Sequence, residues 1–224
     1  VLEHPVAAGA PALGRPAVIN MSLGSDYGPH DGTTLEERGL DDLAGAGRVV
    51  VVAAGNPGAA NWSQNLRWGY ALHGSGALST EAVTFRFPQY TASTGDDYMF
   101  MDVWYPGGSN KCRVRITTPS GKVYPPATAK STWVTGSAYA GYNTTEGGLL
   151  VQNGGDPFGF GSTNGMQDAY IEISDYWGTA PVAGTFTIQL VAADTKSKCV
   201  GTYHAWYGAS DSVVKGWQDE PARN

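Results

Sequence analysis

Residues 16–56 read PAVINMSLGSDYGPHDGTTLEERGLDDLAGAGRVVVVAAGN, and this order of apolar and polar runs predicts a strand, a helix and a second strand. Residues 17–23 form a short, mostly apolar run after a proline, which is typical of a strand buried on both faces. Thr34 and Glu37 form a capping box, which predicts a helix that ends at residues 45–47. Residues 48–54 are rich in valine and suit the middle of a sheet. The spacing therefore predicts a right-handed βαβ unit with a parallel sheet.

The rest of the chain has a different residue pattern. Short segments rich in β-branched and aromatic residues alternate with turn clusters, which predicts strands at residues 82–87, 98–105, 112–118, 169–174, 184–193 and 199–208. We therefore expect a mainly β fold: an antiparallel, jelly-roll-like β-sandwich preceded by a small α/β piece. The predicted boundaries give an α/β segment at residues 1–75, a β-sandwich domain at 76–210 and a C-terminal connection at 211–224.

Composition excludes several classes of protein. The net charge is −6, and basic residues occur only singly or in pairs, so we expect no nucleic-acid partner. No run of about 18 apolar residues is present, so we expect no membrane span. The chain begins without Met in an Ala/Gly/Pro-rich stretch, which indicates a piece of a longer protein.

Two motifs resemble the subtilisin-like serine proteases: VINMSLG at residues 18–24 and VAAGN at residues 52–56, with a helix between them. The resemblance implies that Ser22, Leu23 and Gly24 bind the substrate backbone and line one wall of the S1 pocket. Ala54 and Gly55 would form the opposite wall, and Asn56 would donate its side-chain amide to the oxyanion. The segments at residues 184–190 and 204–207 resemble the closing strands of jelly-roll insertion domains found in some of these proteases.

The catalytic triad of that family is missing. Asp31-Gly32-Thr33 and His73-Gly74-Ser75 do not fit the family's aspartate and histidine motifs, and no Gly-Thr-Ser follows. An oxyanion donor without a nucleophile and a base cannot perform covalent acyl transfer. We therefore expect a catalytically incomplete fragment of a secreted serine endopeptidase, whose parent enzyme acts on a peptide or protein. The alternative is a carbohydrate-active β-sandwich, either a glycoside hydrolase or a sugar-binding module.

The cysteines Cys112 and Cys199 allow a single pairing. Both lie beside predicted strands, where a disulfide is easily formed, and a disulfide suits a secreted protein. Two unrelated buried thiols remain the alternative.

Other residue clusters suggest ligands. No cofactor is expected, although Asp96, Asp97, Asp156 and Asp168, with Asp175, lie in turn-rich regions that suit a calcium ion. The histidines are dispersed, so zinc is disfavoured. Several aromatic residues suit a sugar-stacking platform, although burial in a core explains most of them: Trp104, Trp133, Tyr139, Tyr142, Phe158, Phe160, Trp177 and Trp206.

Two further expectations concern catalysis and association. A glycosidase would need two facing carboxyl groups from the set Glu81, Glu146, Glu172, Asp156, Asp168 and Asp175. The strands of the α/β piece would expose apolar edges unless they are covered, which predicts packing against the β domain or self-association.

Overall fold

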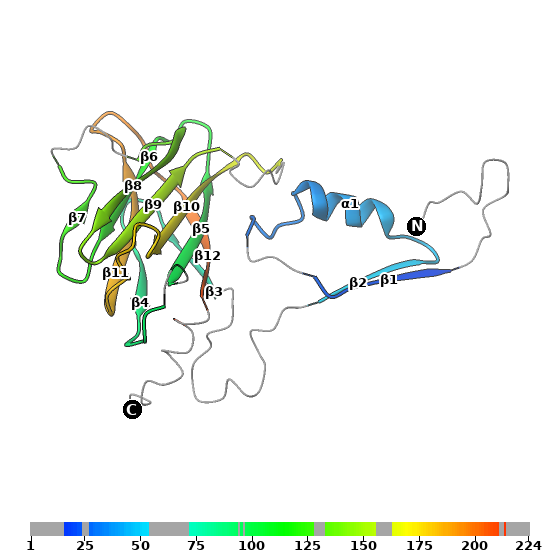
Figure 1. Ribbon diagram of the computed structural model, residues 1–224. Helices are drawn as coiled ribbons and strands as arrows, with labels where there is room; N and C mark the ends of the chain where they lie inside the picture. The colour runs from blue at the N-terminus through cyan, green and yellow to red at the C-terminus, as the bar shows by residue number, and fades with distance from the viewer. Residues whose placement is uncertain are drawn as a thin grey trace, which may run out of the picture.

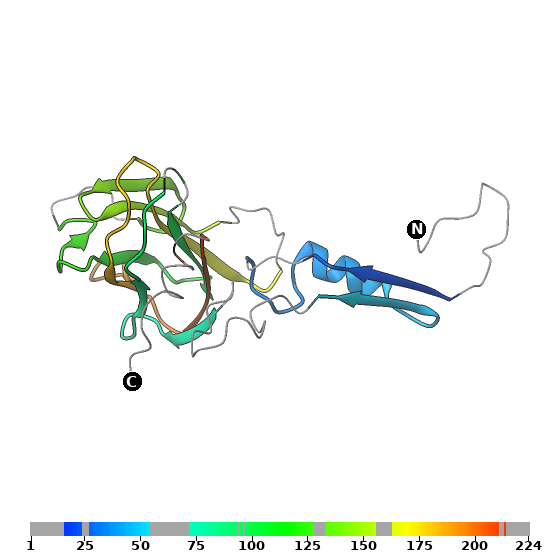
Figure 2. The ribbon, with the colours of Figure 1, turned by 60° about the horizontal axis from the view of Figure 1, so that its bottom comes forward.

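The computed structural model describes residues 16–23, 27–53, 72–93, 95, 97–127, 133–155, 163–210 and 213 (Figure 1). These residues form a β-sandwich and a small unit of two strands and one helix. The small unit lies beside the sandwich in Figures 1 and 2. No helix in the described part of the chain is long and apolar enough to cross a membrane.

The small unit has the predicted order of strand, helix and strand. β1 (Ala17–Met21) pairs in parallel with β2 (Arg48–Val52), from Ala17 opposite Arg48 to Met21 opposite Val52. Between them, α1 (Leu35–Leu43) begins with the predicted capping box: the Thr34 hydroxyl accepts from the Glu37 amide, and the Glu37 carboxylate accepts from the Thr34 amide. The cap satisfies amides that the first helical turn leaves without a partner.

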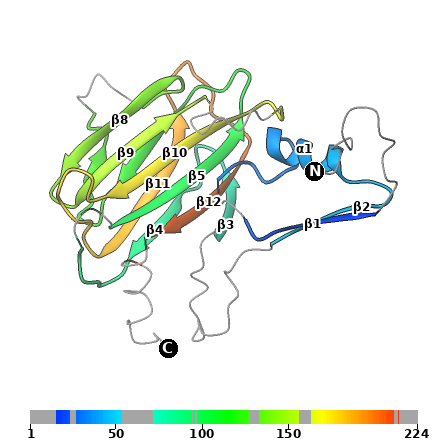
Figure 3. The same ribbon diagram turned by 45° about the vertical axis from the view of Figure 1, so that its right-hand side comes forward.

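The sandwich consists of two antiparallel sheets that pack face to face. The six-stranded sheet has the order β3 (Leu72–Ala77), β12 (Thr202–Ala209), β5 (Tyr98–Pro106), β10 (Met166–Ser174), β9 (Gly147–Asn153) and β8 (Ser137–Thr144). The four-stranded sheet has the order β4 (Val83–Phe87), β11 (Gly184–Ala192), β6 (Cys112–Thr117) and β7 (Val123–Tyr124). Figure 3 shows the strands of the larger sheet side by side in this order. The predicted mainly β, jelly-roll-like fold preceded by a small α/β piece is confirmed.

The core lies between the two sheets. Alternate residues of each strand face inward, among them Met99, Met101, Val103, Val114, Ile116, Leu149, Val151, Ile171, Ile173, Phe186 and Ile188. Phe87 and Phe186 meet edge to face, with ring centroids 5.5 Å apart. Both belong to the four-stranded sheet, so this pair fixes β4 against β11 from inside the core.

A disulfide joins the two sheets near one end of the sandwich. Cys112 begins β6 of the smaller sheet, and Cys199 precedes β12 of the larger sheet; their Cα atoms are 5.1 Å apart. Both residues are buried. The bridge spans 87 residues of sequence, so in the chain-entropy model it stabilises the fold by about 4 to 5 kcal/mol.

The prediction that the first strand is buried on both faces is wrong. Val18, Val49 and Val51 are 68%, 50% and 48% exposed and lie on one face of the two-stranded sheet. The helix lies against the other face, where the alternate residues are partly buried. A two-stranded sheet with one helix can cover only one of its faces.

The predicted domain boundaries at residues 75 and 210 stay predictions. Strand β3 (Leu72–Ala77) includes residue 75 and pairs with β12, so pairing within the larger sheet begins at Leu72 among the described residues.

Candidate functional site

The carboxyl ends of β1 and β2 lie side by side. The Ala53 amide donates to the Met21 carbonyl oxygen at 3.0 Å, which extends the parallel pairing to the ends of both strands. Ser22 and Leu23 follow directly, and both are exposed, Leu23 to 72%. In open parallel sheets, ligands bind just beyond the carboxyl ends of the strands.

Only part of the predicted substrate-binding set can be placed. Ser22 and Leu23 lie at this edge, while Gly24, Ala54, Gly55 and Asn56 lie outside the described residues. The roles that the resemblance gives to all six residues stay predictions. The register nevertheless brings the segments after Met21 and after Val52 to the same edge, because these two residues are direct partners.

Residues 27–33, which precede α1 and its cap, rest on the outer face of the six-stranded sheet. Tyr27 stacks on Phe100 of β5 with ring centroids 4.6 Å apart, and the Gly28 amide donates to Oδ2 of Asp102 at 2.6 Å. His30 stacks on Trp206 of β12 with centroids 4.5 Å apart. These contacts join residues far apart in sequence, and they explain why β5 is buried on both of its faces.

Two further hydrogen bonds hold the end of this segment. Asp31 accepts from the side-chain amide of Asn164 at 2.8 Å, and the Thr163 amide donates to the carbonyl oxygen of Thr33 at 3.3 Å. Asp31 also accepts from the backbone amide of Thr33. Burial raises the pKa of Asp31, but the hydrogen bonds from Thr33 and Asn164 outweigh it, so the pKa lies below its ordinary value. Asp31 is therefore ionised at neutral pH.

Two buried aspartates lie beneath this segment. Asp102 on β5 and Asp168 on the neighbouring strand β10 are 0% and 1% exposed, and their carboxyl groups interact. Burial raises the pKa of Asp102 above its ordinary value, although Asp168, Gly28 and Trp104 act in the opposite direction. Oδ1 of Asp102 is buried and accepts no hydrogen bond from the described residues. Burial therefore favours the protonated form of Asp102.

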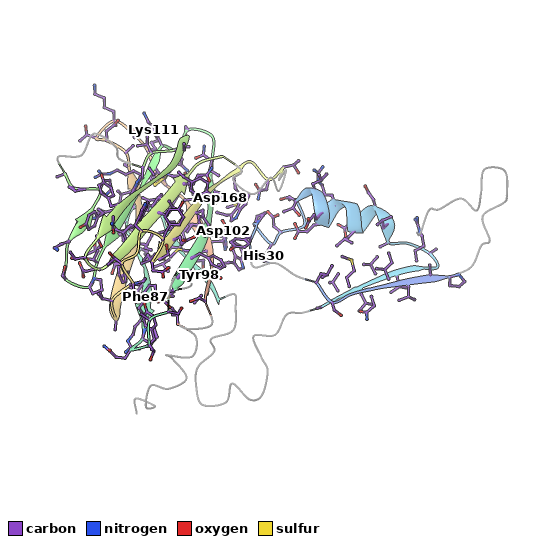
Figure 4. All side chains as sticks on the ribbon, viewed as in Figure 1. His30, Phe87, Tyr98, Asp102, Lys111 and Asp168 are labelled. Carbon is purple, nitrogen blue, oxygen red and sulfur yellow. A yellow bond between two sulfur atoms is a disulfide. The ribbon has the colours of Figure 1, made fainter. Side chains whose placement is uncertain are left out.

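A cavity of about 500 Å³ opens between the segment and the sheet. Pro29, His30 and Asp31 line one side, and Trp104, Met166, His204 and Trp206 line the other. Trp104 is joined to the aspartates, because its Nε1–H donates to Oδ2 of Asp102 at 3.1 Å. Figure 4 labels His30, Asp102 and Asp168, which lie on the side of the sandwich that faces α1.

The calcium candidates do not come together. Asp97 precedes β5 and accepts from the Ser93 amide at 2.8 Å, whereas Asp168 lies opposite Trp104, near the other end of β5. Asp96 and Asp156 lie outside the described residues. Among the residues that the structure describes, no group of three or more His, Cys, Asp or Glu side chains is placed to hold a metal ion.

Several carboxylates considered for glycosidase chemistry are engaged in hydrogen bonds. Glu81 accepts from the Ala77 amide, Glu172 from the Tyr170 hydroxyl and Asp175 from the Gly95 amide. Glu146 accepts from Thr118 and Ser120. Asp168 interacts with a second carboxyl group, that of Asp102, which was not on the predicted list.

The aromatic candidates divide between the core and the surface. Trp133 is buried in the core, and Tyr142 packs against it there. Trp104 and Trp206 line the cavity, while Tyr139 and Trp177 are 50% and 38% exposed. Phe158 and Phe160 lie outside the described residues. Carbohydrate binding stays a prediction.

Sequence reasoning missed Asp102, His30 and His204 as members of one site. A signal for Asp102 exists, because it is the one charged residue in the apolar run YMFMDVWY, at a position that alternation places opposite the core. No such signal joins His30 to Trp206, because 176 residues separate them.

Comparisons with known proteins place the fold. No family model matches the sequence, and no curated protein matches it. The structure is similar to that of the CspB protease of Clostridium perfringens, with a TM-score of 0.58 and 21% sequence identity. The match covers 86% of this chain and 35% of the protease chain, so this chain spans about a third of its neighbour's length.

The predicted assignment to the subtilisin-like serine proteases with a jelly-roll insertion domain is therefore wrong as a statement of family. Neither sequence comparison supports it, and structural likeness at 21% identity shows a shared fold alone. Two short motifs are too small a part of 224 residues to establish a family. The coarser statement holds: the chain is similar in structure to part of a protease.

Proposed function

We propose that this chain is a portion of a protease that carries the walls of a peptide-binding cleft and a β-sandwich that supports them. The cleft would lie at the carboxyl ends of β1 and β2, with Leu23 on one wall and the segment before Asn56 on the other. Asn56 would stabilise the oxyanion. The chain itself would bind peptide without cleaving it, because its sequence offers no matching nucleophile and base.

The observation that carries this proposal is the parallel register of β1 and β2. It ends with Met21 opposite Val52, so residues 22–24 and 53–56 follow from adjacent strand ends. An extended peptide beside Ser22 and Leu23 could pair with their backbone. Leu23 is exposed, and the pairing of β1 with β2 ends before it, at Met21. The similarity to part of the CspB protease is consistent with this reading.

In this proposal the β-sandwich supports one wall of the cleft. The segment after Leu23 continues into Tyr27 and Gly28, which are held by Phe100 and Asp102 of β5. A cleft wall that leads directly into an anchored segment loses less conformational entropy when a peptide binds. We assign the sandwich the role of fixing this wall.

Peptide titration of the ¹⁵N-labelled chain tests the proposal. A capped tetrapeptide of apolar residues should shift the backbone amide signals of residues 22–24 and 53–56, and mass spectrometry should find the peptide intact. Leu23→Glu should weaken binding by about tenfold, since it places a charge on an apolar wall. Leu35→Glu is the matched control, because Leu35 is similarly exposed, at 64%, but lies on α1.

Two outcomes would overturn the proposal. One is the absence of amide shifts at both strand ends at peptide concentrations up to about 10 mM, where even a weak site is occupied. The other is turnover of chromogenic glycosides that a single Glu or Asp substitution abolishes, which would favour the carbohydrate-active alternative.

A further inference from the structure

The cavity between residues 29–31 and the outer sheet face is separate from the proposed peptide cleft. Two indole rings, a thioether and two imidazoles supply most of its lining, from Trp104, Trp206, Met166, His30 and His204. Its volume of about 500 Å³ is within the range of small-molecule sites, about 300 to 1,000 Å³. The cavity can therefore admit a side chain or a small molecule.

The segment that closes this cavity is held in an uncommon conformation. His30 has a φ of 51°, which is unfavourable for a residue with a Cβ atom. Its ring nevertheless stacks on Trp206 with centroids 4.5 Å apart. Backbone strain of this kind occurs preferentially at ligand-binding positions, and here it lies on the cavity wall.

The charges around the cavity favour a cation. Asp31 supplies an ionised carboxylate to the lining, and none of the described residues that line the cavity is Lys or Arg. Anions would be repelled by this carboxylate. Cations, by contrast, are attracted both to the carboxylate and to the faces of indole rings.

The buried aspartates strengthen this preference through Trp104. Its indole N–H donates to the Asp102 carboxyl group, whose neighbour is Asp168. Hydrogen bonding to an acidic group shifts electron density into the ring, and hydrogen-bonded groups polarise one another in a buried setting. The Trp104 indole, which belongs to the cavity lining, therefore becomes more attractive to a positive charge.

We propose that this cavity binds an organic cation, a guanidinium or ammonium group, between the Trp104 and Trp206 side and the Asp31 carboxylate. The group could come from an arginine or lysine side chain of a peptide or from a small free amine. This inference does not rest on the proposed peptide cleft.

Binding of matched small molecules to the full 224-residue chain tests the inference. N-acetyl-arginine amide and N-acetyl-lysine amide represent the peptide source, and choline represents a free amine. N-acetyl-citrulline amide is the uncharged control, because it keeps the shape of arginine without the charge. The readout is the indole Nε1–H signals of Trp104 and Trp206 and the amide signals of His30 and Asp31 in ¹⁵N-correlated spectra.

The cations should shift these signals in a saturable way, and citrulline should bind at least about tenfold more weakly than arginine. Added salt should weaken binding, since one wall is an ionised carboxylate at an accessible site. Tighter binding of the arginine and lysine amides would identify a peptide side chain as the source of the cation, and tighter binding of choline would identify a free amine.

Two substitutions locate the binding in the cavity. Asp31→Asn should weaken cation binding by about three- to tenfold, since it removes the charge and leaves an oxygen acceptor. Asp194→Asn is the matched control, because Asp194, like Asp31, accepts from the backbone amide two positions later but lies outside the cavity lining. Trp206→Leu, checked for an unchanged fold by its spectrum, should weaken binding as well.

Three results would overturn the inference. They are equal binding of arginine and citrulline amides, an unchanged affinity in Asp31→Asn, and a preference for neutral sugars such as maltose over every cation tested.

Discussion

At the scale of single residues, Asp102 connects the segment before α1 to the sandwich. It lies in the middle of β5 and is fully buried. Its Oδ2 atom accepts from the Gly28 amide and from the Trp104 indole N–H. Burying a carboxyl group in an otherwise apolar strand costs free energy, and these hydrogen bonds offset that cost.

Replacing this side chain should destabilise the protein. Asp102→Ala leaves two buried donors without an acceptor and should lower the free energy of unfolding by about 2 to 4 kcal/mol. Urea denaturation followed by tryptophan fluorescence measures the change. Asp194→Ala should change the midpoint much less, since the hydrogen bonds of that carboxylate lie on an exposed turn where water can replace them. A midpoint for Asp102→Ala equal to that of the parent chain would contradict the role given to Asp102.

The same residue predicts a pH dependence with a definite sign. Burial raises the pKa of Asp102 in the folded state above the ordinary value of 3.8. As the pH rises above about 3.8, the unfolded chain loses this proton while the folded chain retains it, so this residue's contribution to stability falls until the folded pKa is passed. Asp102→Asn removes this titration, so the stability of the parent chain relative to this variant should fall with pH across this window. Parallel stability curves for the two proteins would show that Asp102 has no raised pKa.

At the scale of elements, Glu146 joins turns that belong to the two sheets. It lies in the turn between β8 and β9 and accepts from the Thr118 hydroxyl at 2.6 Å and from the Ser120 amide at 2.9 Å, both in the turn after β6. Burial raises the pKa of Glu146, but these hydrogen bonds outweigh it, so the pKa lies below the ordinary value of 4.5. The contribution of Glu146 to stability is complete above the pKa of this residue in the unfolded chain. It is lost as the pH falls through the pKa of Glu146 in the folded chain.

Glu146→Gln should therefore destabilise the sandwich at neutral pH, by about 1 to 3 kcal/mol, because it weakens charge-assisted hydrogen bonds. The difference from the parent chain should shrink as the pH is lowered below about 4.5, where the parent's own carboxyl group becomes protonated. Thermal unfolding at a series of pH values measures this convergence. A difference independent of pH would indicate a purely steric effect of the substitution.

Sequence patterns predict some strands of the sandwich but not others. Alternation and turn clusters predict β4, β5, β6, β11 and most of β10 and β12, because their inward residues are large and regularly spaced. The strands β8 and β9 escaped prediction because they contain glycines at positions where the indole of Trp177 lies against the sheet. A Cβ atom at Gly148 would stand 2.7 Å from that ring.

The candidate site was less predictable than the fold. Its contacts join Gly28 to Asp102 and His30 to Trp206, across 74 and 176 positions of sequence, and no local pattern encodes such pairings. The motifs around Leu23 and Asn56 consist of adjacent residues, and the roles inferred from them stay predictions. The exposure of Val18 could not be predicted from its neighbours in sequence, since burial depends on what covers a sheet.

At the scale of the whole molecule, an apolar face of the β1–β2 sheet stays uncovered by the described residues. It carries Val18, Val49 and Val51 and belongs to a unit that lies beside the sandwich (Figure 1). Burial of apolar surface favours association by about 25 cal/mol per Å². We therefore expect the isolated chain to self-associate through this face.

Light scattering coupled to size exclusion tests that expectation. Val49→Glu should shift the chain towards the monomer, since it places a charge in the centre of the apolar face. Val200→Glu is the matched control, because Val200 is 60% exposed but lies on the sandwich. A parent chain that elutes as a monomer at all accessible concentrations would contradict the expectation.

In the proposed function, this chain supplies a peptide-binding cleft and an oxyanion donor to a larger protease. The most direct test of this proposal is peptide hydrolysis by the longer polypeptide that we propose contains this chain. Asn56→Ala is compared there with the parent and with Asn143→Ala, which replaces an exposed asparagine on β8. Asn56→Ala should lower kcat by about 100- to 1,000-fold with little change in KM, while Asn143→Ala should have no effect. An unchanged kcat in Asn56→Ala would contradict the oxyanion role that we propose for Asn56.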